Sequence, residues 1–247
     1  MGISQIQDKF YEKVHPFKSG DPKSLLPGQI AWVPTQFFDG NMIVVEVDRA
    51  QRDDHNNVKF KFTRMKASHF QKNEEKLPIP NIKLGATEEL MAFKTKKRPC
   101  IFLGKAEDIN LSEGDLKKLA KGKKHLFTTD CLFLPIYSTH KEDLQKGFPI
   151  EFVTRIKHFL YSHLLYLPSC NLKNLETLRP PKNEGIVRLD RLFVTSPIVP
   201  NVSPTDVMLE SSYFKILKYH VKEYLFKETD PNLKDLRELL EEAYNDL

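Results

Sequence analysis

A continuous apolar run from Cys131 to Ile136 stands out in a chain that is otherwise rich in polar residues. A run this short, with no alternating polar positions, is typical of a strand that is buried on both faces. Met42–Val47 is rich in β-branched residues, and Gly185–Leu192 alternates apolar with charged residues, so both also predict strands. Helical periodicity follows near the C-terminus, where Leu209, Tyr213, Ile216, Leu217 and Tyr224 recur at helical spacing. The sequence therefore predicts an α+β fold.

Composition narrows the class of protein. The chain has 247 residues, of which 40% are apolar and 29% charged, which excludes a wholly disordered chain and allows a substantial core. Its three cysteines stand singly, with no Cys-x-x-Cys pair, so we expect neither a disulfide scaffold nor a zinc site but a reduced, cytoplasmic environment. The longest apolar stretch, residues 158–167, is far shorter than the ~20 residues that a membrane span needs. We expect no membrane segment, no metal and no cofactor.

Charge is distributed unevenly along the chain. Residues 51–130 hold 18 Lys and Arg against 11 Asp and Glu, whereas residues 227–247 hold 3 against 7. A basic body with an acidic tail predicts a polyanionic partner such as a nucleic acid. The alternative is an ordinary solvated surface of mixed sign, which charge alone favours.

Six segments occur in an order that has a counterpart in a known family. Together they resemble the PemK/MazF family of toxin endoribonucleases, with its opening Gly-x-Ile-x-Trp-Val strand, its Arg-Pro strand and its terminal helix. The segments are Pro27–Val33, Lys97–Leu103, Leu134–Ser138, Gly147–Phe152, Gly185–Leu192 and Leu209–Leu225. They cover less than half of the chain, and the family is usually about half as long.

The resemblance implies a fold and an organisation. The fold is a small, strongly bent antiparallel β barrel of the SH3-like type with long insertions and C-terminal helices, within a single domain over residues 1–247. The family usually forms homodimers. The expected core strands are residues 27–50, 97–104, 130–153 and 184–196, the insertions are 51–95 and 156–183, and the terminal helices are 203–226 and 230–245.

The resemblance also implies an activity. Members cleave single-stranded RNA without a metal, using the ribose 2′-hydroxyl as the nucleophile, and each toxin pairs with an antitoxin protein. Such a reaction needs a proton acceptor, a proton donor and positive charge near the phosphorane. Arg188 and Asp190 lie two residues apart on one expected strand, so both project from the same face. We expect Asp190 as base, Arg188 as acid or phosphate clamp, and Arg98 as a second phosphate clamp.

The expected substrate contacts depart from the family at one position. Tyr137 stands where the family has a threonine, followed by Ser138 and Thr139. The hydroxyl of Tyr137, or that of Ser138 or Thr139, would then bind RNA, together with Lys97. The alternative is that this change has ended catalysis and left an inactive module that binds RNA, DNA or a protein partner. On that reading, Arg188 and Asp190 form an ordinary ion pair.

Overall fold

The computed structural model describes residues 2–14, 25–37, 42–49, 58–66, 90–105, 131–139, 147–173, 175, 183–195 and 202–245. The chain forms two compact units: residues 1–34 together with 97–247, and residues 35–96. The sequence predicted one domain with an insertion at 51–95, and that segment falls within the second unit. Helices and antiparallel strands are both present, as expected of an α+β protein. None of the described helices is both long enough and apolar enough to cross a membrane.

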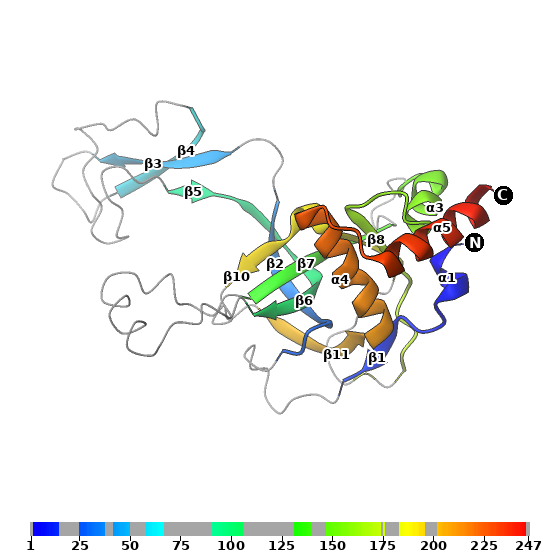
Figure 1. Cartoon of the computed structure of the whole chain (residues 1–247). Coiled ribbons are helices and arrows are strands. Elements are labelled where there is room, and N and C mark those ends of the chain that lie inside the picture. Colours follow the sequence, from blue (N-terminus) through cyan, green and yellow to red (C-terminus); the bar gives the residue numbers. More distant parts are fainter. Residues whose placement is uncertain are drawn as a thin grey trace, which may run out of the picture. The chain divides into compact units, whose positions relative to one another are not determined.

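An eight-stranded antiparallel sheet organises the first unit (Figure 1). Neighbouring strands follow the order β1-β11-β2-β6-β7-β9-β8, and β10 also pairs with β7. The hydroxyl of Tyr11 in β1 donates to the carbonyl of Pro168 just after β8, at 2.7 Å, so a hydrogen bond joins the two ends of this order. The strands are β1 Tyr11–Lys13, β2 Gln29–Phe37, β6 Lys94–Lys105, β7 Cys131–Ser138, β8 Leu164–Leu167, β9 Gly185–Arg188, β10 Phe193–Thr195 and β11 Ser203–Leu209.

Apolar clusters cover both faces of the central strands. Leu134 and Ile136 of β7 belong to the larger cluster, which takes in residues of α4 and α5. Phe133, on the other face of β7, belongs to a smaller cluster with Cys100 and Phe102 of β6. The prediction that Cys131–Ile136 is a strand buried on both faces is confirmed, and so is the strand expected at 97–104.

The start of one predicted helix and part of one predicted insertion are strands in the structure. Residues 203–209 were expected to begin a helix but form β11, which pairs with β1 and β2 and buries Thr205, Asp206, Val207 and Leu209. Residues 164–167, predicted as part of an insertion over 156–183, form β8 and pair with β9 inside the sheet. Pairing with neighbouring strands, which the local sequence does not specify, makes both segments part of the sheet.

Helix α3, Ile150–Lys157, occupies the end of the predicted core strand 130–153. A short apolar run fits a strand or a helix equally well, and here Pro149 stands at the helix N-cap while Ile156 is buried. The strand expected at 184–196 is also interrupted. It consists of β9, a 3-10 helix η5 at Leu189–Arg191, and β10.

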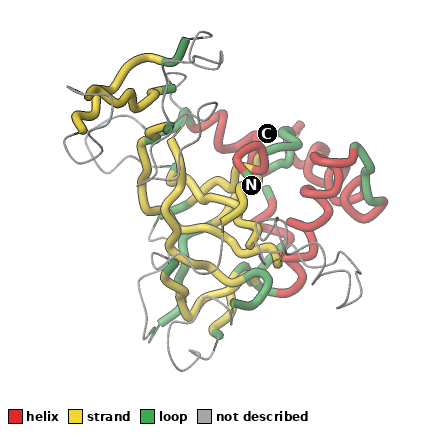
Figure 2. Tube along the Cα trace, turned by 90° about the vertical axis from the view of Figure 1, so that its left-hand side faces the viewer, coloured by secondary structure: helices red, strands yellow, loops and turns green. Residues whose placement is uncertain are grey.

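The described residues of the first unit form four α-helices beside the sheet. In Figure 2 the helices gather on one side of the strands. They are α1 Ile3–Ile6, α3, α4 Ser211–Phe226 and α5 Pro231–Asn245, the last as predicted for 230–245.

The carboxylate of Glu210 caps α4 by accepting from the amides of Ser212 and Tyr213, at 2.9 and 3.3 Å. These bonds, together with the Ser211 and Ser212 hydroxyls, outweigh partial burial and lower the pKa of Glu210 to about 2.

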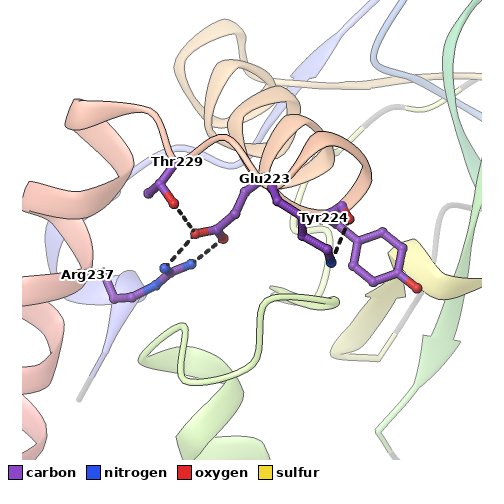
Figure 3. Close-up of polar contacts among 5 residues, drawn as sticks. Glu223, Tyr224, Thr229 and Arg237 are labelled. Atoms are coloured by element: carbon purple, nitrogen blue, oxygen red, sulfur yellow. Dashed lines mark hydrogen bonds and ion pairs between the residues drawn. The ribbon is translucent and has the colours of Figure 1, made fainter.

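An ion pair joins α4 to α5 (Figure 3). Arg237 donates two hydrogen bonds to Glu223, at 2.9 and 2.7 Å, and Thr229 donates a third at 2.8 Å. Lys227, at the C-terminus of α4, adopts a left-handed conformation with φ 60° and lets the chain turn into α5. The two terminal helices are therefore joined by charge-assisted bonds as well as by the apolar contacts of Leu233 and Leu240.

The second unit is built on a three-stranded antiparallel sheet in the order β4-β3-β5. The strands are β3 Ile43–Arg49, β4 Val58–Arg64 and β5 Met91–Ala92. Ile43 faces Arg64, Val45 faces Phe62 and Val47 faces Phe60 across β3 and β4. β3 therefore belongs to this separate sheet, whereas the prediction placed it with β2 in one core.

Candidate functional site

Arg98, Tyr137, Arg188 and Asp190 come together in the first unit. The guanidinium carbon of Arg98 lies 4.4 Å from the centre of the Tyr137 ring, and that of Arg188 lies 5.7 Å from it. Arg188 donates to Asp190 through Nε, at 2.9 Å, and through Nη2. We call these four residues the arginine–tyrosine cluster.

Strand register explains why residues so far apart in sequence meet. Cys100 faces Pro135 across β6 and β7, so the same register sets Arg98 opposite Tyr137. Tyr137 in turn faces Ile186 of β9, and Arg188 is the next residue of β9 on that face. Three adjacent strands thus contribute one side chain each, and side chains paired across a sheet project from the same face.

Asp190 reaches the cluster from the 3-10 helix rather than from a strand. The prediction that it shares a strand face with Arg188 is wrong, because β9 ends at Arg188 and η5 begins at Leu189. The tight turn nevertheless brings its carboxylate onto the Arg188 guanidinium with both oxygens engaged. Arg191, also in η5, adds a longer contact from Nε to Oδ2 at 3.8 Å.

The surrounding charges fix the protonation of this pair. Partial burial opposes ionisation of Asp190, but the hydrogen bonds and charge of Arg188, with the charges of His163 and Arg191, lower its pKa below the ordinary value. Donation of the same hydrogen bonds to Asp190 raises the pKa of Arg188 against the effect of burial. The cluster therefore carries an ionised carboxylate and two guanidiniums at neutral pH, a net positive charge beside an aromatic ring.

The other predicted site residues are placed elsewhere. Thr139 is buried, and its amide and hydroxyl both donate to the carbonyl of Glu184, at 2.9 and 3.1 Å. Lys97 donates to the hydroxyl of Ser203 in β11, at 2.9 Å, on the β2 side of β6 rather than the β7 side. Ser138 is exposed at the end of β7, paired with Gly185.

A second polar group, which the sequence did not predict, lies on the same sheet face. Tyr166 of β8 faces Ile186 from the side opposite Tyr137, and its hydroxyl donates to Glu184 at 2.5 Å. Lys157 of α3 lies 3.3 Å from the same carboxylate and 4.5 Å from the Tyr166 ring centre. Glu184 immediately precedes β9 and is two residues before Ile186 and four before Arg188, and this alternate spacing is the signal that links Glu184 to this face.

The two polar groups differ in their access to a ligand. Tyr166 is buried and is held by Glu184, whereas Tyr137 and Arg188 are partly exposed. Among the described residues, no three His, Cys, Asp or Glu side chains form a group that could hold a metal ion. The side-chain groups that the arginine–tyrosine cluster presents on this partly exposed surface are guanidinium, phenol and carboxylate.

No protein-family model, curated protein or solved structure matches the chain.

Proposed function

We propose that the protein is a metal-independent endoribonuclease that cleaves single-stranded RNA at the arginine–tyrosine cluster. The observation that carries the proposal is the placement of two guanidiniums, Arg98 and Arg188, against one partly exposed ring with a carboxylate bound to the second guanidinium. Guanidinium forks match phosphate oxygens, and an aromatic ring stacks an unpaired base. Single-stranded RNA offers both groups.

The residues can be assigned to the steps of an internal transesterification. Asp190 accepts the proton of the 2′-hydroxyl, whose oxygen then forms a bond to phosphorus. Arg98 and Arg188 stabilise the negative charge of the phosphorane. The Tyr137 hydroxyl donates a proton to the 5′-oxygen as its bond to phosphorus breaks. The products are a 2′,3′-cyclic phosphate and a 5′-hydroxyl.

The proposal extends to the fold and partners that the resemblance to the PemK/MazF family implies. The bond from Tyr11 to Pro168, which joins the two ends of the strand order, supports a strongly bent, barrel-like sheet. A homodimer and an antitoxin protein are part of the same proposal. An acidic antitoxin segment would be attracted to the net positive charge of the cluster.

Cleavage of a long unstructured RNA in EDTA tests the activity. We expect wild-type protein to give discrete fragments with 2′,3′-cyclic phosphate ends, and a single 2′-deoxy substitution at a mapped site to block cleavage there. Arg98→Met and Arg188→Met should each lower the rate at least ~100-fold, the scale of a lost transition-state contact. Lys97→Met is the matched control, because it removes a neighbouring cation outside the cluster. Intact RNA after incubation with folded wild-type protein would refute the proposal.

A second candidate function is favoured by the state of Asp190. Its carboxylate is bound by Arg188 through both oxygens and its pKa is lowered, which makes it a weak proton acceptor. On this alternative the cluster binds RNA, DNA or a protein without cleaving anything. Tight binding of the same RNA, weakened by Arg98→Met but with no product formed, would select this function.

A further inference from the structure

Two phenylalanine rings stand exposed on one face of the second unit. Phe60 and Phe62 of β4 are 53% and 65% exposed, although large aromatic side chains normally account for much of a core. They alternate along the strand with Arg64, so all three side chains project from the same face. The residues opposite them in β3 are Val47, Val45 and Ile43. We call Phe60, Phe62 and Arg64 the β4 face.

Exposed cations lie beside the β4 face, and the two lysines of β4 stand opposite acidic residues of β3, Lys59 opposite Asp48 and Lys61 opposite Glu46. Among the strands that the structure describes, β4 lies at the edge of its sheet, and Lys59 and Lys61 alternate with the two rings on its opposite face. Long lysine side chains at an edge strand can reach a ligand that lies along that edge. Among the side chains described in residues 35–96, the exposed cations are Lys59, Lys61, Arg64, Lys66, Lys94 and Lys96, and the acidic residue is the half-buried Glu46.

Exposed rings and excess positive charge together specify one class of partner. A polyanion satisfies the charge, but only an unpaired base offers a flat face that can stack on Phe60 or Phe62. Alternate residues of a strand are about 6.8 Å apart, which leaves each ring room for its own base. In a duplex the base faces are stacked on one another, so a duplex could make the ionic contacts but could not stack on the two rings.

We propose that the β4 face is a binding site for single-stranded RNA, with bases stacked on Phe60 and Phe62 and phosphates held by Arg64, Lys59 and Lys61. The choice of RNA rests on the proposed function, whereas the stacking chemistry is independent of any cleavage. This unit would hold the RNA strand without reacting with it. No residue of the arginine–tyrosine cluster belongs to it.

Fluorescence anisotropy with the full chain tests the site. The probe is a labelled oligouridine, measured in the Asp190→Asn background so that cleavage cannot consume it. Phe60→Ala with Phe62→Ala should weaken binding about 10-fold or more, since stacking contributes ~1–3 kcal/mol for each base. Phe60→Tyr with Phe62→Tyr should preserve affinity. Leu90→Ala is the matched control, because it removes another exposed apolar side chain of the same unit.

Two further measurements separate stacking from charge. Heparin, a polyanion without bases, should bind the double alanine variant as tightly as it binds the parent protein. Lys59→Gln with Lys61→Gln should reduce the slope of log affinity against log salt by about 1.4, the value for two phosphate contacts on a single strand. Equal loss of heparin and oligouridine binding in the alanine variant would overturn the stacking assignment.

The outcomes also distinguish this site from the proposed activity and from other occupants. If wild-type protein fails to cut RNA while the alanine pair weakens oligouridine binding, the activity is refuted and the binding site stands. If cleavage occurs but the alanine pair leaves oligouridine affinity unchanged, the binding site is overturned. Unchanged RNA affinity with an altered sedimentation coefficient would assign the β4 face to self-association instead.

Discussion

The guanidinium of Arg98 lies over the ring of Tyr137, with 4.4 Å from the guanidinium carbon to the ring centre. The two residues belong to neighbouring strands, and the β6–β7 register holds them opposite each other. Because the ring is partly exposed, its hydroxyl and its face are both candidates for contact with a substrate. These two capacities can be separated by substitution.

Tyr137→Phe should separate the hydroxyl from the ring. The variant retains the cation–π contacts and the stacking surface, so RNA affinity should stay within about 2-fold of wild type. Cleavage should fall about 100-fold if the hydroxyl protonates the leaving oxygen. Tyr137→Leu should weaken both. Single-turnover rates at saturating RNA, with dissociation constants by filter binding, give the two quantities, and an unchanged rate in Tyr137→Phe would exclude the hydroxyl from proton transfer.

Asp190→Asn should change affinity and rate in opposite directions. The substitution removes a negative charge beside Arg188 while keeping the shape of the side chain, so RNA should bind more tightly, by about 3–5-fold at low salt. Cleavage should fall at least ~100-fold, because the amide cannot accept the 2′-hydroxyl proton. Dissociation constants and single-turnover rates for this variant, measured at one salt concentration, test the assignment. Tighter binding at an undiminished rate would leave Asp190 as a purely structural partner of Arg188.

His220 should make the fold sensitive to mild acid. Burial and the charge of Arg237, opposed by Glu223, lower the pKa of His220 to about 3, and its ring packs edge-on against Phe159 at 4.7 Å. The folded state holds the ring neutral, whereas the unfolded chain protonates near pH 6.5. Stability from this group is therefore complete above pH 6.5 and is lost as the pH falls towards 3.

The expected decrease in the free energy of unfolding is measurable between pH 7 and pH 5. Between pH 7 and pH 5 the free energy of unfolding should fall by about 2 kcal/mol through His220 alone. Urea unfolding of wild type and His220→Leu at both pH values tests this, with His163→Leu as the control for a half-buried histidine. The same pH dependence in wild type and His220→Leu would contradict the prediction.

The Glu223–Arg237 pair should stabilise the docking of α5. Its side chains are 13% and 22% exposed, so Arg237→Met leaves a largely buried carboxylate without its cation. We expect a loss of about 2 kcal/mol, below the range for fully buried pairs. The double variant Glu223→Leu with Arg237→Met should recover most of that loss. Urea unfolding and hydrogen exchange of the α5 amides report the two effects.

The pH dependence of the same pair has a defined sign. The Arg237 hydrogen bonds, opposed by partial burial and helped by Thr229, lower the pKa of Glu223 to about 2. The stability that the pair contributes is present above about pH 4.5 and is lost as the pH falls towards 2. A larger loss in the double variant than in Arg237→Met would show that the pair does not act through charge.

Sequence patterns correctly predicted the segments whose own preference for strand or helix is the same as the structure that their tertiary contacts impose. Cys131–Ile136 is apolar throughout and is buried on both faces, and 230–245 carries a helical repeat that α5 realises. Ser203-Pro204 fits a helix N-terminus equally well by composition, but pairing with Trp32 and Ala31 of β2 makes it part of a strand. The local sequence of a segment does not specify which other strands will be adjacent and able to pair with it.

The candidate site was also predicted only in part, because its geometry depends on which strands pair. Arg98, Tyr137, Arg188 and Asp190 were named from short motifs, and they meet because three strands pair in register. The turn that carries Asp190 and the contacts of Glu184 with Tyr166 and Lys157 depend on η5, β8 and α3, which the patterns assigned differently. Thr139 looked like a substrate contact by its position after Tyr137, but its hydroxyl is used within the fold.

Thr35 and Lys96 mark the point where the second unit joins the first. Their strands, β2 and β6, are neighbours in the sheet, and the Thr35 hydroxyl donates to the Lys96 carbonyl at 2.9 Å. The chain therefore leaves the eight-stranded sheet at Thr35 and re-enters it at Lys96, on two neighbouring strands. An entire segment can be gained, lost or exchanged at such a junction without altering the strand order β1-β11-β2-β6-β7-β9-β8, because the two cut ends already lie side by side. Residues 35–96 are therefore connected to the rest of the chain as an inserted domain is. If they were removed, a short turn from Thr35 to Lys96 would connect β2 directly to β6.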